Sequence, residues 1–254
     1  MHEFEITPPL RRFVELLESR AKQSIGGRLR ATLALDARRG SSSDLELGPA
    51  LGAILARRGI TSLFSHQAEA LGFVRAGRDV LVSTATASGK SLIYDLAIAE
   101  RALARRDARA LLLFPLKALE QDQLQSLRAD FAALPVLEGP TAEIYDGDTS
   151  PYQRKRIREQ PPNALFTTPD MLHFGILPGH DAWKEFMRGL ELVVVDEVHA
   201  YRGVLGAHFA QIMRRLLRIA RHHGADPRIV ACSATIGNPA AFARELFGRE
   251  LELV

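Results

Sequence analysis

Two short groups of side chains in this 254-residue sequence could act together on a phosphate chain. The first is Lys90-Ser91, which offers an ammonium group for phosphate oxygens and a hydroxyl group that can bind Mg²⁺. The second is the carboxylate pair Asp196-Glu197. One carboxylate can hold a metal ion, partly through water, while the other orients and deprotonates an attacking water molecule. These residue types favour a site that binds Mg²⁺ and hydrolyses a nucleoside triphosphate.

The sequence around Lys90 predicts a strand, a loop of small residues and then a helix. Residues 79–82 are mainly apolar, and residues 92–98 have apolar side chains at helical spacing. Backbone N–H groups at the start of a helix have no intrahelical partner, so they can bind phosphate where small residues allow it to approach. Thr84 stands where the generic phosphate-binding pattern has its first glycine. The nucleotide-binding residues predicted here are Thr86, Ala87, Ser88, Gly89, Lys90 and Ser91.

The carboxylate pair follows a second predicted strand. Residues 190–195 form a short apolar run that is typical of a strand buried in a parallel sheet. In an open α/β sheet the ligand crevice lies outside the carboxyl ends of the strands, so Lys90 and Asp196 can meet there. We therefore expect Lys90, Asp196 and Glu197 to be catalytic, and Ser91 and Asp196 to be metal ligands. A solvated loop is the alternative for the carboxylate pair taken alone.

Predicted strands and helices alternate along most of the remaining chain. This alternation predicts an α/β fold in which helices cover both faces of a mainly parallel sheet, with right-handed crossovers. Ahead of it, residues 7–17 have the pattern of an amphipathic helix, and residues 24–43 are typical of an irregular connection. Further strands are expected at 110–114, 164–167 and 228–233, and helices at 49–58, 118–131, 206–223 and 239–247, with Ser65 as the N-cap of another helix.

Several blocks of the sequence resemble the motifs of superfamily 2 helicases. Residues 86–91, 196–199 and 233–235 are similar to motifs I, II and III of that superfamily. Together with residues 199–206, the smaller blocks at residues 65–70, 114–119, 145–149 and 168–172 resemble the RecQ4-like group of DNA helicases that contains Hrq1 and MrfA (YprA). The resemblance runs from about Leu47 to the last residue. The smaller blocks occur in the family's order.

The resemblance implies a particular domain organisation. Residues 47–254 would form a three-layer RecA-like domain of the P-loop NTPase type, the first of two in such helicases, and residues 1–46 a helical N-terminal extension. Superfamily 2 helicases carry motifs IV to VI and an arginine finger on a second RecA-like domain. We expect that domain to act in cis, outside this chain.

The resemblance also assigns roles to residues that the chemistry alone leaves open. Gln67 would read adenine, because an amide offers a donor and an acceptor that match N6 and N7. An exposed glutamine in the first turn of a helix is the alternative. His199, Ser233 and Thr235 would couple the nucleotide site to the nucleic-acid surface. Alternatively, their imidazole and hydroxyl groups only bridge neighbouring strands.

Two predicted turns at strand ends resemble nucleic-acid contacts of the family. They contain Pro115 and Lys117 in one turn, and Thr168, Pro169 and Asp170 in the other. Backbone N–H groups and a lysine at a helix start can hold phosphates without reading bases. Simple strand-to-helix turns are the alternative. Two basic clusters, residues 154–158 and 214–223, could also contact phosphates, although charged solvated helix faces would look the same.

Composition limits the other classes of function. Lys and Arg number 33 against 30 Asp and Glu, so the net charge of +3 predicts no polyanion-binding tail. The one cysteine, Cys232, lies in an apolar run and is predicted to be a small buried residue. We expect no disulfide framework and no zinc cluster within this chain. No apolar stretch is long enough to span a bilayer and no signal pattern is present, so we expect a cytoplasmic protein.

These observations favour one function. We expect an ATP-binding domain of an ATP-dependent DNA helicase, which uses ATP and Mg²⁺, prefers DNA to RNA and acts in DNA repair. Without the arginine finger, the isolated domain should be weakly active or inactive. The alternatives are a nucleotide-sensing, nucleic-acid-binding module without useful turnover, and an RNA helicase domain. A small-molecule kinase fits poorly, because Glu197 beside Asp196 suits the activation of water.

Overall fold

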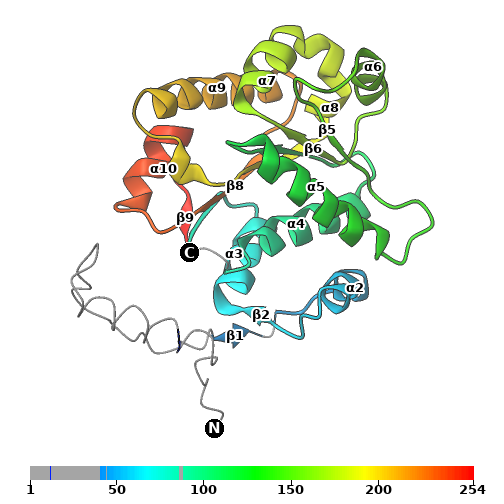
Figure 1. Cartoon of the computed structure of the whole chain (residues 1–254), viewed down its shortest axis with the longest axis vertical. Helices are drawn as coiled ribbons and strands as arrows, with labels where there is room; N and C mark the ends of the chain where they lie inside the picture. Colours follow the sequence, from blue (N-terminus) through cyan, green and yellow to red (C-terminus); the bar gives the residue numbers. More distant parts are fainter. Residues whose placement is uncertain (1–11, 13–40, 44, 86–87) are drawn as a thin grey trace. The chain divides into compact units, whose positions relative to one another are not determined.

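A seven-stranded, entirely parallel sheet forms the centre of the computed structural model (Figure 1), which describes residues 12, 41–43, 45–85 and 88–254. The strand order is β5-β6-β4-β7-β8-β3-β9, so strands that are far apart in the sequence lie side by side. The strands are β3 (Val80–Ser83), β4 (Arg109–Leu113), β5 (Ala142–Ile144), β6 (Ala164–Thr167), β7 (Leu190–Val195), β8 (Arg228–Ser233) and β9 (Glu252–Leu253).

Helices connect these strands, and a two-stranded antiparallel ribbon precedes them. The ribbon pairs β1 (Ser42–Ser43) with β2 (Leu63–Phe64). The α-helices are α2 (Pro49–Arg57), α3 (Ser65–Arg75), α4 (Lys90–Ala104), α5 (Lys117–Ala132), α6 (Pro151–Glu159), α7 (Pro169–Met171), α8 (Lys184–Arg188), α9 (Gly203–His222) and α10 (Pro239–Phe247). Shorter turns are the π-helix η1 (Leu172–Ile176) and the 3₁₀ helices η2 (Leu177–Trp183) and η3 (Val198–Ala200).

The sheet is buried on both faces, as its nearly continuous apolar strands require. Side chains alternate along each strand, so Leu112 packs into one core while Leu111 and Leu113 pack into the other. The first core also contains α2, α3, α4 and α5, and the second contains α8, α9 and α10, in agreement with the layers in Figure 1. The arrangement is a three-layer α/β fold.

Because all seven strands are parallel, their carboxyl ends meet at one edge of the sheet. At that edge β3 leads into α4, β4 into α5, β6 into α7 and β7 into η3. The turns after these strands contain most of the side chains singled out by the sequence analysis. The fold therefore brings the predicted phosphate, metal and nucleic-acid groups to a common surface.

Most predicted element boundaries are confirmed, with a few differences. Helix α10 follows Asn238 and ends where Gly248 adopts a left-handed conformation (φ 66°). Ser65 is the first residue of α3 rather than its N-cap, because Phe64 holds the extended N-cap conformation. Helix α9 begins at Gly203, three residues before the predicted start. Ser42 and Ser43, predicted to be irregular, form β1.

The predictions for residues 1–40 fall almost entirely outside the part of the chain that the structure describes. The expected helix at residues 7–17 lies outside the described residues, apart from Arg12. The chain divides into two units, residues 1–41 and residues 42–254, and all the strands named above belong to the second unit. Among the described helices, none combines the length and the apolar character needed to cross a membrane.

Candidate active site

The loop between β3 and α4 is closed by its own lysine. Lys90 is the first residue of α4, and its Nζ donates hydrogen bonds to the carbonyl oxygens of Thr84 at 3.1 Å and Ala85 at 2.8 Å. The hydroxyls of Thr84 and Ser88 lie 2.6 Å apart and share a hydrogen bond. Ser91 follows Lys90 in the first turn of α4 and is half-buried. The predicted loop residues Thr86 and Ala87 lie outside the described part of the chain.

Helix α3 holds the end of this loop. Gln67 Nε2 donates to the carbonyl oxygen of Gly89 at 2.9 Å, and Gln67 Oε1 accepts from the N–H of Phe64 at 2.9 Å. His66 Nε2 lies 3.0 Å from the carbonyl oxygen of Ser88. Gln67 is buried, with 4% of its surface exposed, so it is not the exposed first-turn residue of the alternative interpretation. Its amide keeps one further N–H and one lone pair, and adenine recognition stays a prediction.

Asp196 is fixed at the end of β7 by two donors. Its Oδ2 accepts a hydrogen bond from the Tyr94 hydroxyl at 3.0 Å, and its Oδ1 accepts one from the Glu197 N–H at 2.8 Å. Burial raises the pKa of Asp196, while these hydrogen bonds and the charge of Lys90 oppose that rise. Lys90 and Tyr94 are four residues apart on α4, so one helix face carries both groups that act on Asp196. Asp196 is thus a partly desolvated carboxylate held in place beside the loop.

Glu197 occupies an unusual backbone conformation. Its φ of 50° and ψ of 45° lie in the left-handed region, which is uncommon for a residue other than glycine. Its Oε2 is buried and accepts no hydrogen bond among the described residues, although His199 Nδ1 lies 3.2 Å away and pairs with it only when that nitrogen is protonated. A buried carboxylate oxygen without a partner calls for a ligand or an ordered water molecule. The Glu197 carboxylate is therefore placed to bind a water molecule next to Asp196.

His199 connects the carboxylate pair with the turn after β8. Its Nδ1 lies 3.2 Å from Glu197 Oε2 and 3.4 Å from the backbone nitrogen of Ala234. One ring nitrogen cannot donate to the carboxylate and accept from the N–H at once, so the two contacts belong to different protonation states or tautomers. With Nδ1 unprotonated, His199 accepts from Ala234, and this state leaves Glu197 Oε2 without a donor. The imidazole can therefore exchange one contact for the other.

The two predicted coupling hydroxyls are placed differently from the imidazole. Ser233 is fully buried, and its Oγ has no hydrogen-bond partner within the described chain. Thr235 is exposed. The link between the ends of β7 and β8 therefore runs through the His199 ring and the backbone of Ala234, and Ser233 does not form the strand-bridging contact of the alternative interpretation. Roles of Ser233 and Thr235 in coupling stay predictions.

All five predicted nucleic-acid residues line one cavity of about 390 Å³. Lys117 is exposed, and its Nζ lies 2.9 Å from Asp148 Oδ2 and 3.5 Å from Asp146 Oδ2. A phosphate would have to compete with these carboxylates for the ammonium group. We call this cavity the strand-end groove; it is lined by Pro115, Lys117, Gly147, Thr168, Pro169, Asp170, Met171, Phe174, Tyr201 and Leu205.

The two groups of groove residues begin helices, as predicted. Lys117 is the first residue of α5, and Thr168 is the N-cap of α7, where its hydroxyl accepts from the Met171 N–H at 3.2 Å. In the basic cluster 154–158, Arg154 donates to the carbonyl oxygen of Thr149 and Arg156 to a carboxylate oxygen of Glu143. Those two arginines are thus engaged within the protein, in accordance with the interpretation of a charged helix face.

The sequence analysis missed several residues of the site. Tyr94 belongs to an apolar-periodic run and was indistinguishable from a core residue, although its spacing of four from Lys90 was a usable signal. Glu120 gave no signal, yet it is fully buried on α5. Trp183 packs in the core, with 2% of its surface exposed. Phe64 is 45% exposed, and its ring stacks on His66.

Fold and site together define a P-loop NTPase domain of the RecA-like class. The DEAD/DEAH box helicase family matches residues 64–242, and the chain belongs to that family. It is 40% identical over 189 residues to the ATP-dependent helicase HRQ1 of Saccharomyces cerevisiae and 42% identical over 202 residues to the ATP-dependent helicase YprA of Bacillus subtilis. These matches cover 74% and 80% of the chain.

A solved structure supports the same assignment. The helicase MrfA bound to DNA and AMPPNP superimposes with a TM-score of 0.83 at 38% identity, over 87% of the chain. The chain spans only part of these proteins: 18% of HRQ1, 27% of YprA and 31% of the MrfA chain. The resemblance found in the sequence, to superfamily 2 helicases and to the Hrq1 and MrfA group, is confirmed.

Proposed function

We propose that this chain is the first RecA-like domain of an ATP-dependent DNA helicase, which couples ATP hydrolysis to translocation along nucleic acid and strand separation. One observation carries the proposal: Lys90, Asp196 and the buried Glu197 Oε2 converge at the carboxyl edge of one parallel sheet. Phosphate binding, metal binding and water activation need those three groups in one place. A role in DNA repair rests on the family resemblance.

Each side chain has a distinct part in hydrolysis. The Lys90 ammonium would exchange the carbonyl oxygens of Thr84 and Ala85 for β- and γ-phosphate oxygens. Ser91 and Asp196 would hold Mg²⁺, which neutralises charge on the phosphates when it is bound. Tyr94 keeps Asp196 oriented through its hydroxyl. Glu197 would orient a water molecule with its free Oε2 and accept its proton.

His199 is placed to link the state of Glu197 to the turn after β8, at the same carboxyl edge of the sheet. When Glu197 takes up a water molecule or a proton, the preference of His199 Nδ1 between Glu197 and the Ala234 N–H changes. The Ala234 backbone belongs to the turn after β8, which is flanked by Ser233 and Thr235. We infer that this exchange is the coupling step between nucleotide and nucleic acid.

Nucleic acid would bind along the strand-end groove. Lys117 supplies a cation there, and Thr168 and Pro169 begin a short helix at its wall. Such contacts hold the phosphate backbone and carry no base information. DNA is favoured over RNA because the relative MrfA has been solved with DNA. Because the chain spans less than a third of the MrfA chain, we propose that a second RecA-like domain in cis completes the site.

The test is ATP hydrolysis by this chain, with and without single-stranded DNA, beside a version extended through the second RecA-like domain. The extended protein should hydrolyse ATP faster by about a thousandfold or more, the effect given for an arginine finger. Glu197→Gln should remove hydrolysis in both lengths. Glu159→Gln, at an exposed position at the end of α6, is the matched control and should change nothing.

Two results would contradict the proposal. If the extended protein gained neither hydrolysis nor strand separation, the chain would instead be a nucleotide-sensing module without useful turnover. If single-stranded RNA stimulated hydrolysis and DNA did not, the chain would be an RNA helicase domain.

A further inference from the structure

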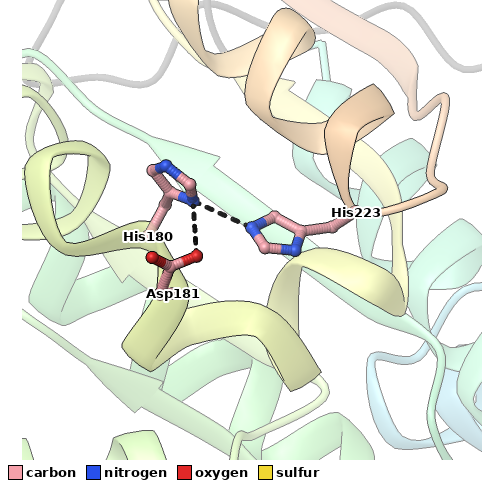
Figure 2. Close-up of side chains that lie close together, drawn as sticks. All are labelled: His180, Asp181 and His223. Carbon is pink, nitrogen blue, oxygen red and sulfur yellow. Dashed lines mark hydrogen bonds and ion pairs between the residues drawn. The ribbon is translucent and has the colours of Figure 1, made fainter.

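Two histidines and an aspartate lie close together outside the lining of the strand-end groove (Figure 2). His180 and Asp181 lie on η2, and His223 follows the last residue of α9. His180 Nδ1 lies 3.0 Å from His223 Nε2 and 3.4 Å from Asp181 Oδ1. The three ligand atoms all lie within 4.8 Å of one another. The proposed nucleotide and nucleic-acid sites do not include these three residues.

The spacing of these atoms matches a coordination shell. A zinc ion binds imidazole nitrogen and carboxylate oxygen at about 2.0–2.2 Å in tetrahedral geometry, which places neighbouring ligand atoms roughly 3.3 Å apart. The two distances from His180 Nδ1 lie on either side of this value. In Figure 2 the three side chains point toward one another from two different elements. We propose that His180, Asp181 and His223 form a binding site for a divalent transition-metal ion of the Zn²⁺ class.

The ligand types select the class of metal. Imidazole suits Zn²⁺, Cu²⁺, Ni²⁺ and Co²⁺, whereas Mg²⁺ and Ca²⁺ prefer sites made only of oxygen. The Asp181 carboxylate is 90% exposed and supplies the negative charge of the site. Three protein ligands leave the fourth tetrahedral position to a water molecule. The site would therefore be an open, surface-accessible centre.

The hydrogen bond between the two imidazoles already directs one nitrogen of each ring toward the same point. In the structure one proton lies between His180 Nδ1 and His223 Nε2. On metal binding, the donor ring moves its proton to its other nitrogen, so both facing nitrogens present lone pairs and no net proton is released. The charge of Arg188 opposes the cation, while Asp181 favours it.

Such a site would join two parts of the fold that are 43 residues apart in the sequence. Element η2 continues from α7 and η1, which supply the groove residues Pro169, Met171 and Phe174. Helix α9 packs in the second core. A metal ion bound only by the folded chain would hold η2 against the end of α9 and raise the melting temperature with metal concentration.

The experiment is a Zn²⁺ titration of the untagged chain, first stripped with a chelator, in excess Mg²⁺ to occupy the oxygen-only site at Asp196. We expect one Zn²⁺ per chain, a rise in melting temperature, and the visible absorption of a tetrahedral centre when Co²⁺ replaces Zn²⁺. His180→Ala and His223→Ala should each weaken Zn²⁺ binding at least tenfold. His208→Ala, at an exposed position on the same helix α9, is the matched control and should bind as the wild type does.

Asp181→Asn separates coordination from folding, because that side chain is exposed. It should keep the metal-free melting temperature of the wild type and lose most of the Zn²⁺-induced rise. The proposal is overturned if the wild type binds no Zn²⁺ under these conditions. It is equally overturned if His180→Ala, His223→Ala and Asp181→Asn all bind Zn²⁺ as tightly as His208→Ala does.

Discussion

Glu197 has two energetically unfavourable features that a purely structural residue would avoid. A left-handed backbone conformation at a residue other than glycine costs on the order of 1–3 kcal/mol, and such conformations cluster at functional sites. Its buried Oε2 also accepts no hydrogen bond from the described residues when His199 Nδ1 is unprotonated. Both features become reasonable if the side chain must present one oxygen to a water molecule. They support the division of roles in which Asp196 holds the metal ion and Glu197 acts as the base.

Glu197→Gln tests that division. The amide keeps the shape of the side chain and loses the base, so hydrolysis of bound ATP should fall at least about a hundredfold, the lower range for general-base catalysis. Single-turnover hydrolysis, with protein in excess over ATP, measures this step even when turnover is slow. Hydrolysis at the wild-type rate would show that Glu197 is not the base.

Glu120 predicts a dependence of stability on pH. It is fully buried at the start of α5, and neither carboxylate oxygen has a hydrogen-bond partner among the residues described. Burial and the nearby Asp146 raise its pKa to about 8, against an opposing effect of Lys117. The folded state therefore prefers the protonated carboxyl group. Its contribution to stability is complete below the unfolded pKa of 4.5 and is lost as the pH rises to about 8.

Glu120→Gln should remove this loss. Near pH 5 the variant and the wild type should have similar free energies of unfolding. At pH 8.5 the variant should be more stable, by on the order of 1–3 kcal/mol, the cost of an unpartnered buried polar group. Urea unfolding at the two pH values measures the difference. A variant that follows the wild type at both pH values would show that the carboxyl group finds a partner in solution.

Sequence patterns located the reacting groups of the site but not the residues that support them. Lys90 could be predicted because it ends the small-residue loop after one apolar run, and Asp196 and Glu197 because they directly follow another, which places all three at the ligand edge. Tyr94 and Glu120 could not be predicted, because their roles arise from partners distant in the sequence. The Tyr94 hydroxyl meets Asp196, which is 102 residues away.

At the level of elements, the phosphate-binding loop depends on helix α3. Gln67 and His66, from the first turn of α3, meet the carbonyl oxygens of Gly89 and Ser88. Gly89 has a φ of 74°, and a Cβ atom there would lie 2.6 Å from Gln67 Nε2. Only glycine satisfies both the conformation and the close approach without strain. The conformation of the loop therefore depends on its contacts with α3.

Gly89→Ala tests this dependence of the loop on α3. A left-handed alanine costs roughly 1–2 kcal/mol, and displacement of the Gln67 amide removes a hydrogen bond worth about 1 kcal/mol. The melting temperature should fall by roughly 4–10 °C for a domain of this size. Gly72→Ala in the interior of α3 is the control, because its Cβ would meet no described atom within 4 Å and alanine favours a helix. Equal melting temperatures for the two variants would contradict this description of the loop.

The elements themselves were largely predictable, because the apolar periodicity agrees with the positions of the residues that begin and end helices. Asn238, Pro239 and Gly248 mark the two ends of α10, as the sequence indicated. The two turns between α7 and α8, η1 and η2, were not predicted. That segment mixes π-helical and 3₁₀ turns, and neither has the period of an α-helix. Phe64 is aromatic, yet its position just before α3 leaves it half exposed.

For the molecule as a whole, one edge of the sheet would serve both ligands. The nucleotide groups follow β3 and β7, and the groove residues follow β4, which lies beside β7, and β6, which lies beside β4. Nucleotide and nucleic acid would therefore bind at neighbouring strand ends. With a net charge of only +3, affinity for nucleic acid must come from local contacts such as Lys117 rather than from the overall field.

Binding of single-stranded DNA should accordingly depend on salt. Each phosphate contact contributes a slope of about −0.7 to the logarithm of affinity against the logarithm of salt concentration. Lys117→Ala should weaken binding and reduce the steepness of this slope by about that amount. Lys155→Ala, an exposed lysine on α6 outside the groove, is the control and should leave the slope unchanged. A slope that responds to Lys155 and not to Lys117 would place the DNA on a different face.

The central claim is that Lys90, Asp196 and Glu197 form a nucleotide-hydrolysis site with divided roles. Calorimetric titration of Mg²⁺-ATP into the wild type, Lys90→Ala and Glu197→Gln tests it most directly. We predict saturable binding by the wild type, nearly equal affinity for Glu197→Gln, and a loss of at least about tenfold for Lys90→Ala, which removes a charged hydrogen-bond donor. Equal affinity of Lys90→Ala and the wild type, or loss of binding in Glu197→Gln, would contradict the account.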